Sequence, residues 1–229
     1  MKRKQVPQFT NQAWFPQHLK TLIYEFMSWF VGKIGAARPF LPVVEKGLLH
    51  TPNQTLINIE VDAGAGMETL EPHLPAQVQI KEVALSDFHT TEAGLYTMVN
   101  AFHQLPANEA QALLTDVAQS RNPVMILEGN NDSLWQVVGM TIFVPLTVLL
   151  TAPLVTPFRW TRLLFTYLIP ILPIITLIDG FLALFKLYAP GDLDELTSRV
   201  PVSNYAWESG KMDNGRGGKI MYLLGHATA

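Results

Sequence analysis

The sequence predicts an α/β protein whose mostly parallel sheet is completed by a C-terminal antiparallel hairpin. Short apolar runs alternate with helical patterns through residues 53–130, which is typical of parallel strands joined by covering helices. Residues 191–229 carry the pattern of two further strands around the glycine-rich turn DNGRGGK, which predicts the hairpin. N-terminal helices over 1–52 and an apolar helical insertion over 131–190 complete the expected architecture.

The composition excludes several classes of function. The chain has 229 residues, a formal net charge of −3 and no cysteine. A net negative charge gives no sign of a nucleic-acid partner. The lack of cysteine excludes disulfides, thiolate metal ligands and cysteine nucleophiles, and the histidines show no metal-like spacing. Charged residues make up 15% of the chain, against about a quarter in typical soluble domains, so part of the molecule is unusually apolar.

The N-terminal part predicts an irregular arm and two helices. Apolar residues such as Leu22, Phe26 and Phe30 recur at spacings of three and four within 17–35, which predicts an amphipathic helix. A second helix is expected over 39–50. The basic start of the chain is followed by no apolar run with a cleavage site, so we do not expect a secretory signal peptide.

The central part predicts four strands and their connecting helices. A short helix is expected after the first strand, and a longer one is expected within PANEAQALLTDVAQS, with Asn108 as its N-cap. The strands are expected at 56–61, 78–85, 95–102 and 122–128.

A glycine-rich turn follows the first strand directly. It reads Asp62, Ala63, Gly64, Ala65, Gly66, so two glycines stand where the chain enters a helix. Glycines allow the backbone to approach a ligand closely, and ligands of parallel sheets bind at the carboxyl ends of the strands. Polar residues stand at the other strand ends of the predicted sheet as well, namely Asn100, His103 and Glu128.

The insertion has the composition of a membrane-associated element. The stretch 133–158 contains no charged residue and is long enough to span a bilayer, whereas the second apolar run reaches that length only by including Asp179. A spanning pair would place Arg159 and Arg162 on the far side, against the positive-inside tendency. We therefore expect a monotopic or re-entrant element in the cytoplasmic leaflet. The alternative is that these helices pack on the sheet or on a second subunit.

Several longer motifs resemble class I S-adenosylmethionine-dependent methyltransferases, in particular a bacterial subgroup with a hydrophobic insertion. The resemblance covers nearly the whole chain, and its most distinctive blocks contain NAFHQL and PFRWTRLLFTYLIP. It implies a Rossmann-like sheet and S-adenosylmethionine as the cofactor. The other blocks are AWFP, VMILEGN, the DG at 179–180, and YAWESGK with IMYLLG near the C-terminus.

The resemblance also assigns residues to the cofactor site. Asp62, Gly64 and Gly66 correspond to the loop at the methionine moiety. An acidic residue at the end of the second strand is expected on the ribose hydroxyls, with Glu82 as the first candidate and Asp87 as the second. Asn100 is expected at the methyl-transfer position.

Two further residues are candidates for catalysis. His103 is expected to face the methyl-transfer position as a general base, the alternative being a loop or capping histidine. Asp179 interrupts an apolar run, where an unpaired carboxylate is costly to bury. It is expected to bind substrate, to cap the following helix, or to pair with Arg159 or Arg162. Glu128 is expected either in the site or as an N-cap.

Together these features predict a methyltransferase on the cytoplasmic face of the membrane that acts on a lipophilic small-molecule acceptor. Membrane lipid is an expected partner, and the oligomeric state is left open. Two departures from the family pattern support an alternative. Glu68 stands where the loop usually has a small residue, and the segment between Gly66 and the NAFHQL block is one strand–helix unit short. The alternative is an inactive pseudo-methyltransferase that serves as a membrane-associated structural or interaction subunit.

Overall fold

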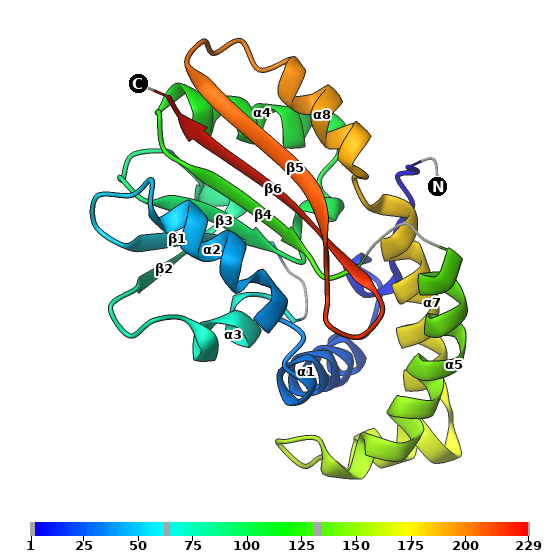
Figure 1. The fold of residues 1–229 in the computed structure, drawn as a ribbon. Coiled ribbons are helices and arrows are strands. Elements are labelled where there is room, and N and C mark those ends of the chain that lie inside the picture. The colour runs from blue at the N-terminus through cyan, green and yellow to red at the C-terminus, as the bar shows by residue number, and fades with distance from the viewer. Residues whose placement is uncertain (1–2, 62–64, 131–133, 229) are drawn as a thin grey trace.

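The protein is built around one six-stranded sheet (Figure 1). The structure is a computed structural model that describes residues 3–61, 65–130 and 134–228. The strand order is β2-β1-β3-β4-β6-β5; the first four strands run parallel, and β6 pairs antiparallel with both β4 and β5. The predicted α/β class with a Rossmann-like, mostly parallel sheet and a C-terminal hairpin is confirmed. The strands are β1 (Thr55–Glu60), β2 (Gln79–Ala84), β3 (Leu95–Val99), β4 (Val124–Glu128), β5 (Tyr205–Asp213) and β6 (Lys219–Ala227).

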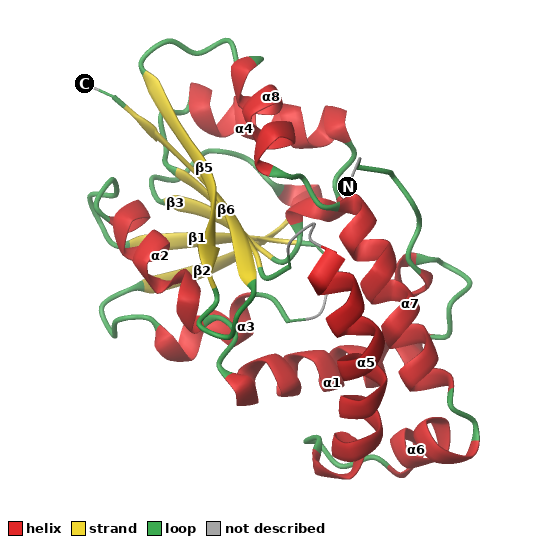
Figure 2. Ribbon diagram, turned by 45° about the vertical axis from the view of Figure 1, so that its right-hand side comes forward, coloured by secondary structure: helices red, strands yellow, loops and turns green. Residues whose placement is uncertain are grey.

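Helices cover both faces of the sheet (Figure 2). Ile57 and Ile59 of β1 belong to a core with α4 (Ala107–Gln119) and α8 (Pro190–Ser198). The alternate residue Leu56 belongs to the opposite core, with α2 (Leu41–Leu48) and α3 (Met67–Leu70). Burial on both faces explains why the central strands are continuous apolar runs.

The insertion packs against the N-terminal helix and, through Leu184 and Leu187, also against Met221 of β6 in the sheet. Leu22 and Phe26 of α1 (Gln17–Ile34) share a core with Val148, Val155 and Leu172. The second half of the insertion bends by 80° between residues 168 and 171, where Pro170 precedes α7. The elements of the insertion are α5 (Leu134–Thr151), α6 (Trp160–Leu163), a π-helical turn (Leu164–Leu168) and α7 (Ile171–Lys186).

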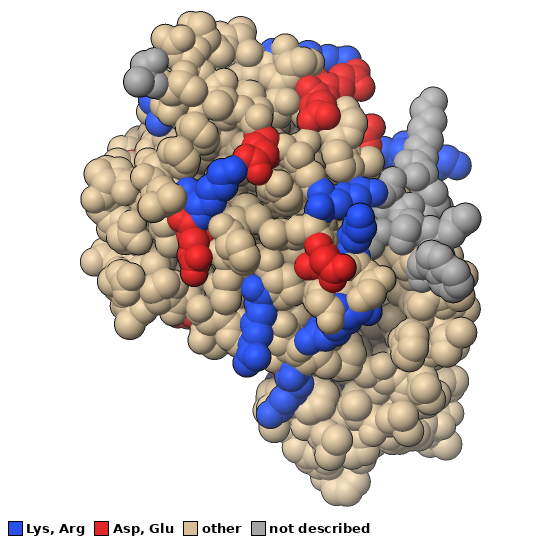
Figure 3. Space-filling model, in the orientation of Figure 1, with Lys and Arg blue, Asp and Glu red and all other residues tan. Residues whose placement is uncertain are grey.

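The insertion exposes many apolar side chains. Figure 3 shows no Lys, Arg, Asp or Glu at the outer end of the insertion on the visible face. Among the described residues, one helix (Gln136–Leu154) is long and apolar enough to cross a membrane, and 11% of its apolar window is buried. The bent pair Trp160–Leu168 and Ile171–Lys186 passes the same test when it is counted as one span. The exposed apolar side chains include Ile142, Phe143, Leu146, Leu150, Leu154, Phe158, Trp160 and Leu168.

Several elements differ from the prediction, most of them by one or two residues at an end. The helix predicted with Asn108 as its N-cap begins two residues earlier than that cap implies, at Ala107 after the N-cap Pro106, so the assignment of Asn108 was wrong. Pro106 is favourable there because a helix start needs no N–H donor. The third strand ends at Val99 because Asn100 adopts a positive φ of 54°. Helix α8 was not predicted.

Candidate functional site

The predicted site residues gather at the carboxyl ends of the parallel strands. Ala65 and Gly66 follow β1, Asn100 follows β3, and Glu128 ends β4. The order β2-β1-β3 places the strand that leads to the glycine turn between two parallel neighbours, which is the usual position of a ligand crevice in such sheets. Asp62 and Gly64 lie outside the described residues.

Asn100 connects three of these strand ends. Its Nδ2 donates to the carbonyl of Ala65 at 2.7 Å, and its Oδ1 accepts from the backbone N of Gly129 at 2.7 Å. Its own N–H donates to the carbonyl of Leu127 at 2.8 Å. Asn100 has a positive φ of 54°, which asparagine tolerates better than most residues. The same residue therefore forms the turn with its backbone and both bridges with its side chain. Asn100 therefore holds the end of the glycine turn in place.

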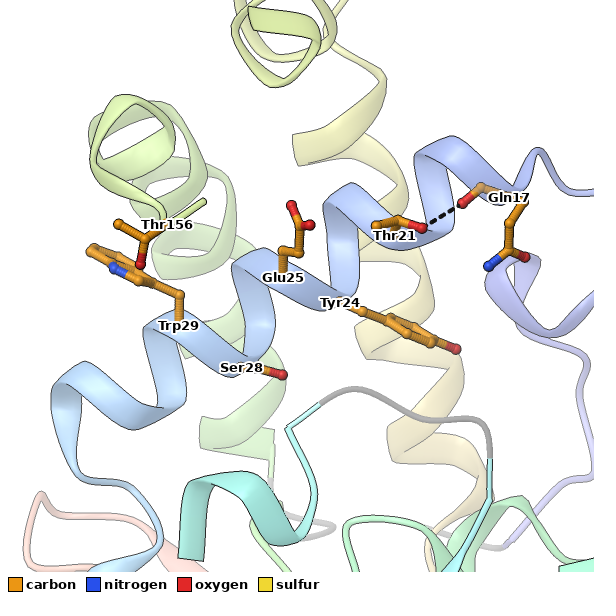
Figure 4. A pocket seen from close by; sticks show the side chains of 7 residues that line it. All are labelled: Gln17, Thr21, Tyr24, Glu25, Ser28, Trp29 and Thr156. Atoms are coloured by element: carbon orange, nitrogen blue, oxygen red, sulfur yellow. Dashed lines mark hydrogen bonds between the residues drawn. The ribbon is translucent and has the colours of Figure 1, made fainter. Parts of the chain in front are cut away.

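The carboxylate of Glu68 turns back onto the glycine turn. Its Oε1 accepts a hydrogen bond from the backbone N of Gly66 at 3.1 Å and another from the hydroxyl of Ser28 at 2.6 Å. The Ser28 hydroxyl in turn accepts from the backbone N of Ala65 at 3.3 Å. The close-up shows Ser28 on α1 pointing toward the segment that leads into α3 (Figure 4). Both amides of the turn are thus paired. The Gly66 amide binds the Glu68 carboxylate, and the Ala65 amide binds the Ser28 hydroxyl, which is itself bound to that carboxylate.

Acidic residues line the neighbouring strand ends. Burial raises the pKa of the Glu60 carboxyl at the end of β1, and the carboxylates of Glu82 and Glu68 raise it further. Glu82 is exposed, pairs in register with Asn58, and stands two residues before the end of β2 rather than at its end. Asp87 lies in the turn directly after β2. The ribose contact predicted for Glu82 stays a prediction. Glu60 is a further acidic residue of this region that was not predicted.

His103 and Glu128 form a buried pair. The backbone N–H of His103 donates to Glu128 Oε1 at 2.9 Å, and the ring Nδ1 lies 3.0 Å from Oε2. Both side chains are 8% exposed. If Glu128 is ionised, it can only accept a hydrogen bond, so a neutral His103 ring has to carry its proton on Nδ1. The other ring nitrogen, Nε2, is then an acceptor. The arrangement is that of an oriented histidine base, and it also caps the turn after β3.

Asp179 anchors the N-terminal arm. Its Oδ1 accepts from the backbone N of Phe9 at 2.7 Å, and its Oδ2 accepts from the N and hydroxyl of Thr10 at 2.9 and 2.7 Å. Asp179 is buried, so these three bonds compensate its loss of hydration. The expected pairing with Arg159 or Arg162 does not occur. The catalytic role of Asp179 stays a prediction, while its contacts assign it a structural one.

Both arginines bind Glu25 on α1 instead. Arg159 donates to Glu25 through Nε and Nη2, at 2.6 to 2.9 Å. The guanidinium of Arg162 is fully buried, binds Glu25, and also donates to the carbonyls of Val155 and Pro157 at 3.0 Å. This cluster ties the insertion to α1.

A cavity of about 470 Å³ runs along α1 near the turn (Figure 4). Ser28 and Glu25 both line it, so it lies between the glycine turn and the insertion. Sequence reasoning missed it, although the polar residues of α1 recur at helical spacing. That stripe consists of Gln17, Thr21, Tyr24, Glu25 and Ser28.

Comparison with protein-family models and with curated proteins finds no match for this chain. The sheet topology is that of a Rossmann-like α/β protein. No group of three or more His, Asp or Glu within the described ranges could hold a metal ion.

Proposed function

We propose that the protein is an S-adenosylmethionine-dependent methyltransferase that acts on a lipophilic small molecule at the cytoplasmic face of a membrane. The observation that carries this proposal is the junction of the glycine turn with Asn100 and the His103–Glu128 pair at one edge of a parallel sheet. The predicted cofactor residue Gly66 and the predicted base His103 both belong to it. Asn100 connects the turns on which they depend.

The residues of the turn fit a ligand that carries a carboxylate. The Gly66 amide already holds the carboxylate of Glu68, which shows that this donor is oriented toward an anion. The same amide would hold the carboxylate of the cofactor once Glu68 turned outward. The neighbouring carboxylates of Glu60 and Glu82 favour a ligand that also carries positive charge, as a sulfonium and an ammonium group do.

The remaining roles belong to the chain itself. When bound, S-adenosylmethionine supplies an electrophilic methyl group. Asn100 keeps the turn beneath the cofactor in one conformation. His103 Nε2 takes the proton of an acceptor that has to lose one, and Glu128 holds the ring and stabilises its positive charge.

The membrane location rests on the insertion. Phe143, Leu150 and Trp160 are more than half exposed, and they belong to an apolar surface of a kind that soluble monomers rarely present. Leu154 and Phe158 flank Thr156, which lines the cavity next to α1. A lipophilic acceptor would therefore reach this cavity, which Ser28 joins to the glycine turn, directly from the lipid.

The test is transfer of labelled methyl groups from S-adenosylmethionine to a lipid extract of bacterial membranes by the full chain in detergent. We expect label in the organic phase with the wild type, less with His103→Gln, and none with Gly66→Leu. A Cβ atom at Gly66 would meet Val99 O at 3.6 Å and Glu68 Oε2 at 3.3 Å, so the larger side chain obstructs the turn. Equal label from the wild type and Gly66→Leu would contradict the proposal.

One observation favours a second candidate. Glu68 and Ser28 already saturate the amides of Ala65 and Gly66, as in a site that has exchanged its ligand for an internal anion. A pseudo-methyltransferase with a structural or interaction role at the membrane would retain such a closed turn. This candidate predicts that removing the Glu68 carboxylate restores no cofactor binding.

A further inference from the structure

The cavity along α1 has the size of a small-molecule site. Its volume of about 470 Å³ lies within the range of roughly 300–1,000 Å³ that is typical of ligand pockets. Its wall is formed by one face of α1 together with Thr156 from the insertion (Figure 4). The cavity is therefore bounded by two elements that are far apart in the sequence.

The lining offers hydroxyl groups and no unbalanced negative charge. Glu25 is the one charged residue among the described lining residues, and its carboxylate is bound by the guanidinium groups of Arg159 and Arg162. The other polar groups of the lining residues are the amide of Gln17, the indole N–H of Trp29 and the hydroxyls of Thr21, Tyr24, Ser28 and Thr156. Such a lining offers hydrogen-bond partners to an uncharged polar head, and none of its described residues is a cation that would pair with an anionic head.

Two rings contribute the apolar part of the wall. Tyr24 and Trp29 of α1 both line the cavity (Figure 4). Aromatic side chains contribute large contact areas and attract ring-shaped ligands by stacking or edge contacts. An aromatic head is therefore favoured over an aliphatic one.

The cavity is connected at both ends to the features already described. Ser28 lines it and binds both Glu68 and the Ala65 amide of the glycine turn. Thr156 lines it and stands between Leu154 and Phe158, which are 63% and 51% exposed. A head in the cavity would thus lie beside the turn, while an attached chain could follow the apolar surface of the insertion.

We propose that this cavity binds an uncharged amphiphile with a hydroxylated aromatic head, of the alkylphenol or alkylated hydroquinone class. As an acceptor site this inference rests on the proposed function, because it names the substrate class of that methyltransferase. As a binding site it depends on the cavity alone.

The experiment is calorimetric titration of 4-hexylresorcinol into the full chain in detergent, without S-adenosylmethionine. The comparison ligands are 4-hexylbenzoate, which is charged, and 1-decanol, which has no ring. Thr21→Trp fills the cavity, and Thr115→Trp on α4 is the matched control. Each threonine is half-buried in a helix and donates to the carbonyl four residues earlier, at 3.0 and 2.8 Å. Trp29→Leu removes a ring without filling the cavity.

We expect 4-hexylresorcinol to bind the wild type and Thr115→Trp at least about tenfold more tightly than either comparison ligand, which corresponds to about 1.4 kcal/mol. Thr21→Trp should lose this binding, and Trp29→Leu should lose the preference for the ring. Unchanged binding by Thr21→Trp would place the ligand elsewhere. Equal binding of 1-decanol would reduce the effect to partition of an apolar chain. Either result overturns the inference.

The outcome is separable from that of the proposed function. Cavity binding in a protein that binds no S-adenosylmethionine would retain the amphiphile site and reject the methyltransferase. Cofactor binding together with failure of the titration would retain the methyltransferase and reject this acceptor class.

Discussion

The hydroxyl of Ser28 donates a hydrogen bond of 2.6 Å to the carboxylate of Glu68, which itself accepts from the Gly66 amide. This contact joins the N-terminal helix to the glycine turn across 40 residues of sequence. It also places an internal anion where the carboxylate of a cofactor is expected. Under the proposed function, cofactor binding therefore requires displacement of the Glu68 carboxylate.

Removing that carboxylate should increase the affinity for cofactor. Hydrogen bonds to charged groups contribute about 1.5–3 kcal/mol, so Glu68→Ala should tighten binding of S-adenosylhomocysteine roughly tenfold. Ligand-induced shifts of the unfolding temperature measure this change. Glu68→Gln is the control, because its amide oxygen still accepts a hydrogen bond, and it should show a smaller gain. Weaker binding by Glu68→Ala would show that Glu68 supports the ligand rather than competing with it.

The bridges made by Asn100 should contribute to both stability and binding. Asn100→Gly keeps the positive φ of 54° without strain but loses the bonds to Ala65 and Gly129. We expect the free energy of unfolding to fall by about 1–3 kcal/mol, as measured by urea denaturation. Asn100→Ala adds the cost of a left-handed backbone, about 1–2 kcal/mol. Equal stability of Asn100→Gly and the wild type would contradict the role assigned to the side chain.

Asp179 offers a direct choice between a structural and a catalytic role. In Asp179→Asn the amide group retains one acceptor oxygen and faces the donors of Phe9 and Thr10 with its NH2. We expect a loss of about 2–3 kcal/mol of stability and faster proteolysis of the arm at Lys4. Asp116→Asn, on the exposed face of α4, is the control. A variant with wild-type stability, an intact arm and no methyl transfer would support the catalytic interpretation instead.

The apolar surface of the insertion should mediate membrane binding. Phe143 and Leu150 are each 67% exposed on α5. The double variant Phe143→Glu/Leu150→Glu should reduce co-flotation with lipid vesicles by at least about tenfold, because apolar contact is lost and charge would enter the lipid. Leu49→Glu, at an 82% exposed site after α2, should leave flotation unchanged. Similar loss in both variants, or in neither, would argue against this surface.

The periodicity of the sequence predicted the sheet well, because local patterns determine each strand. Buried central strands such as β3 and β4 are continuous apolar runs, and the alternation with helices implied their parallel order. The errors lie where local signals are weak. Asn108 resembles an N-cap, yet Pro106 ends the preceding turn and starts the helix. At the start of helix α8 the backbone N–H of Ala189 donates to the carboxylate of Asp192, and this capping pair was not predicted.

The candidate site was predicted in part. Asn100, His103 and Glu128 were expected at strand ends because parallel strands place their carboxyl ends at one edge, and the structure brings them there. The partners of Asp179 and of the two arginines could not be predicted. These contacts join residues that are more than 100 positions apart, and no periodic pattern encodes which buried charge meets which partner.

Calorimetric titration of S-adenosylmethionine into the detergent-solubilised protein measures whether the glycine turn binds this cofactor. Gly66→Leu is the control, because a side chain there meets Glu68 and Val99. We expect saturable binding by the wild type that Gly66→Leu abolishes and Glu68→Ala strengthens. The absence of heat with the wild type and with Glu68→Ala, at concentrations well above the micromolar range, would contradict it and leave the pseudo-methyltransferase as the better account.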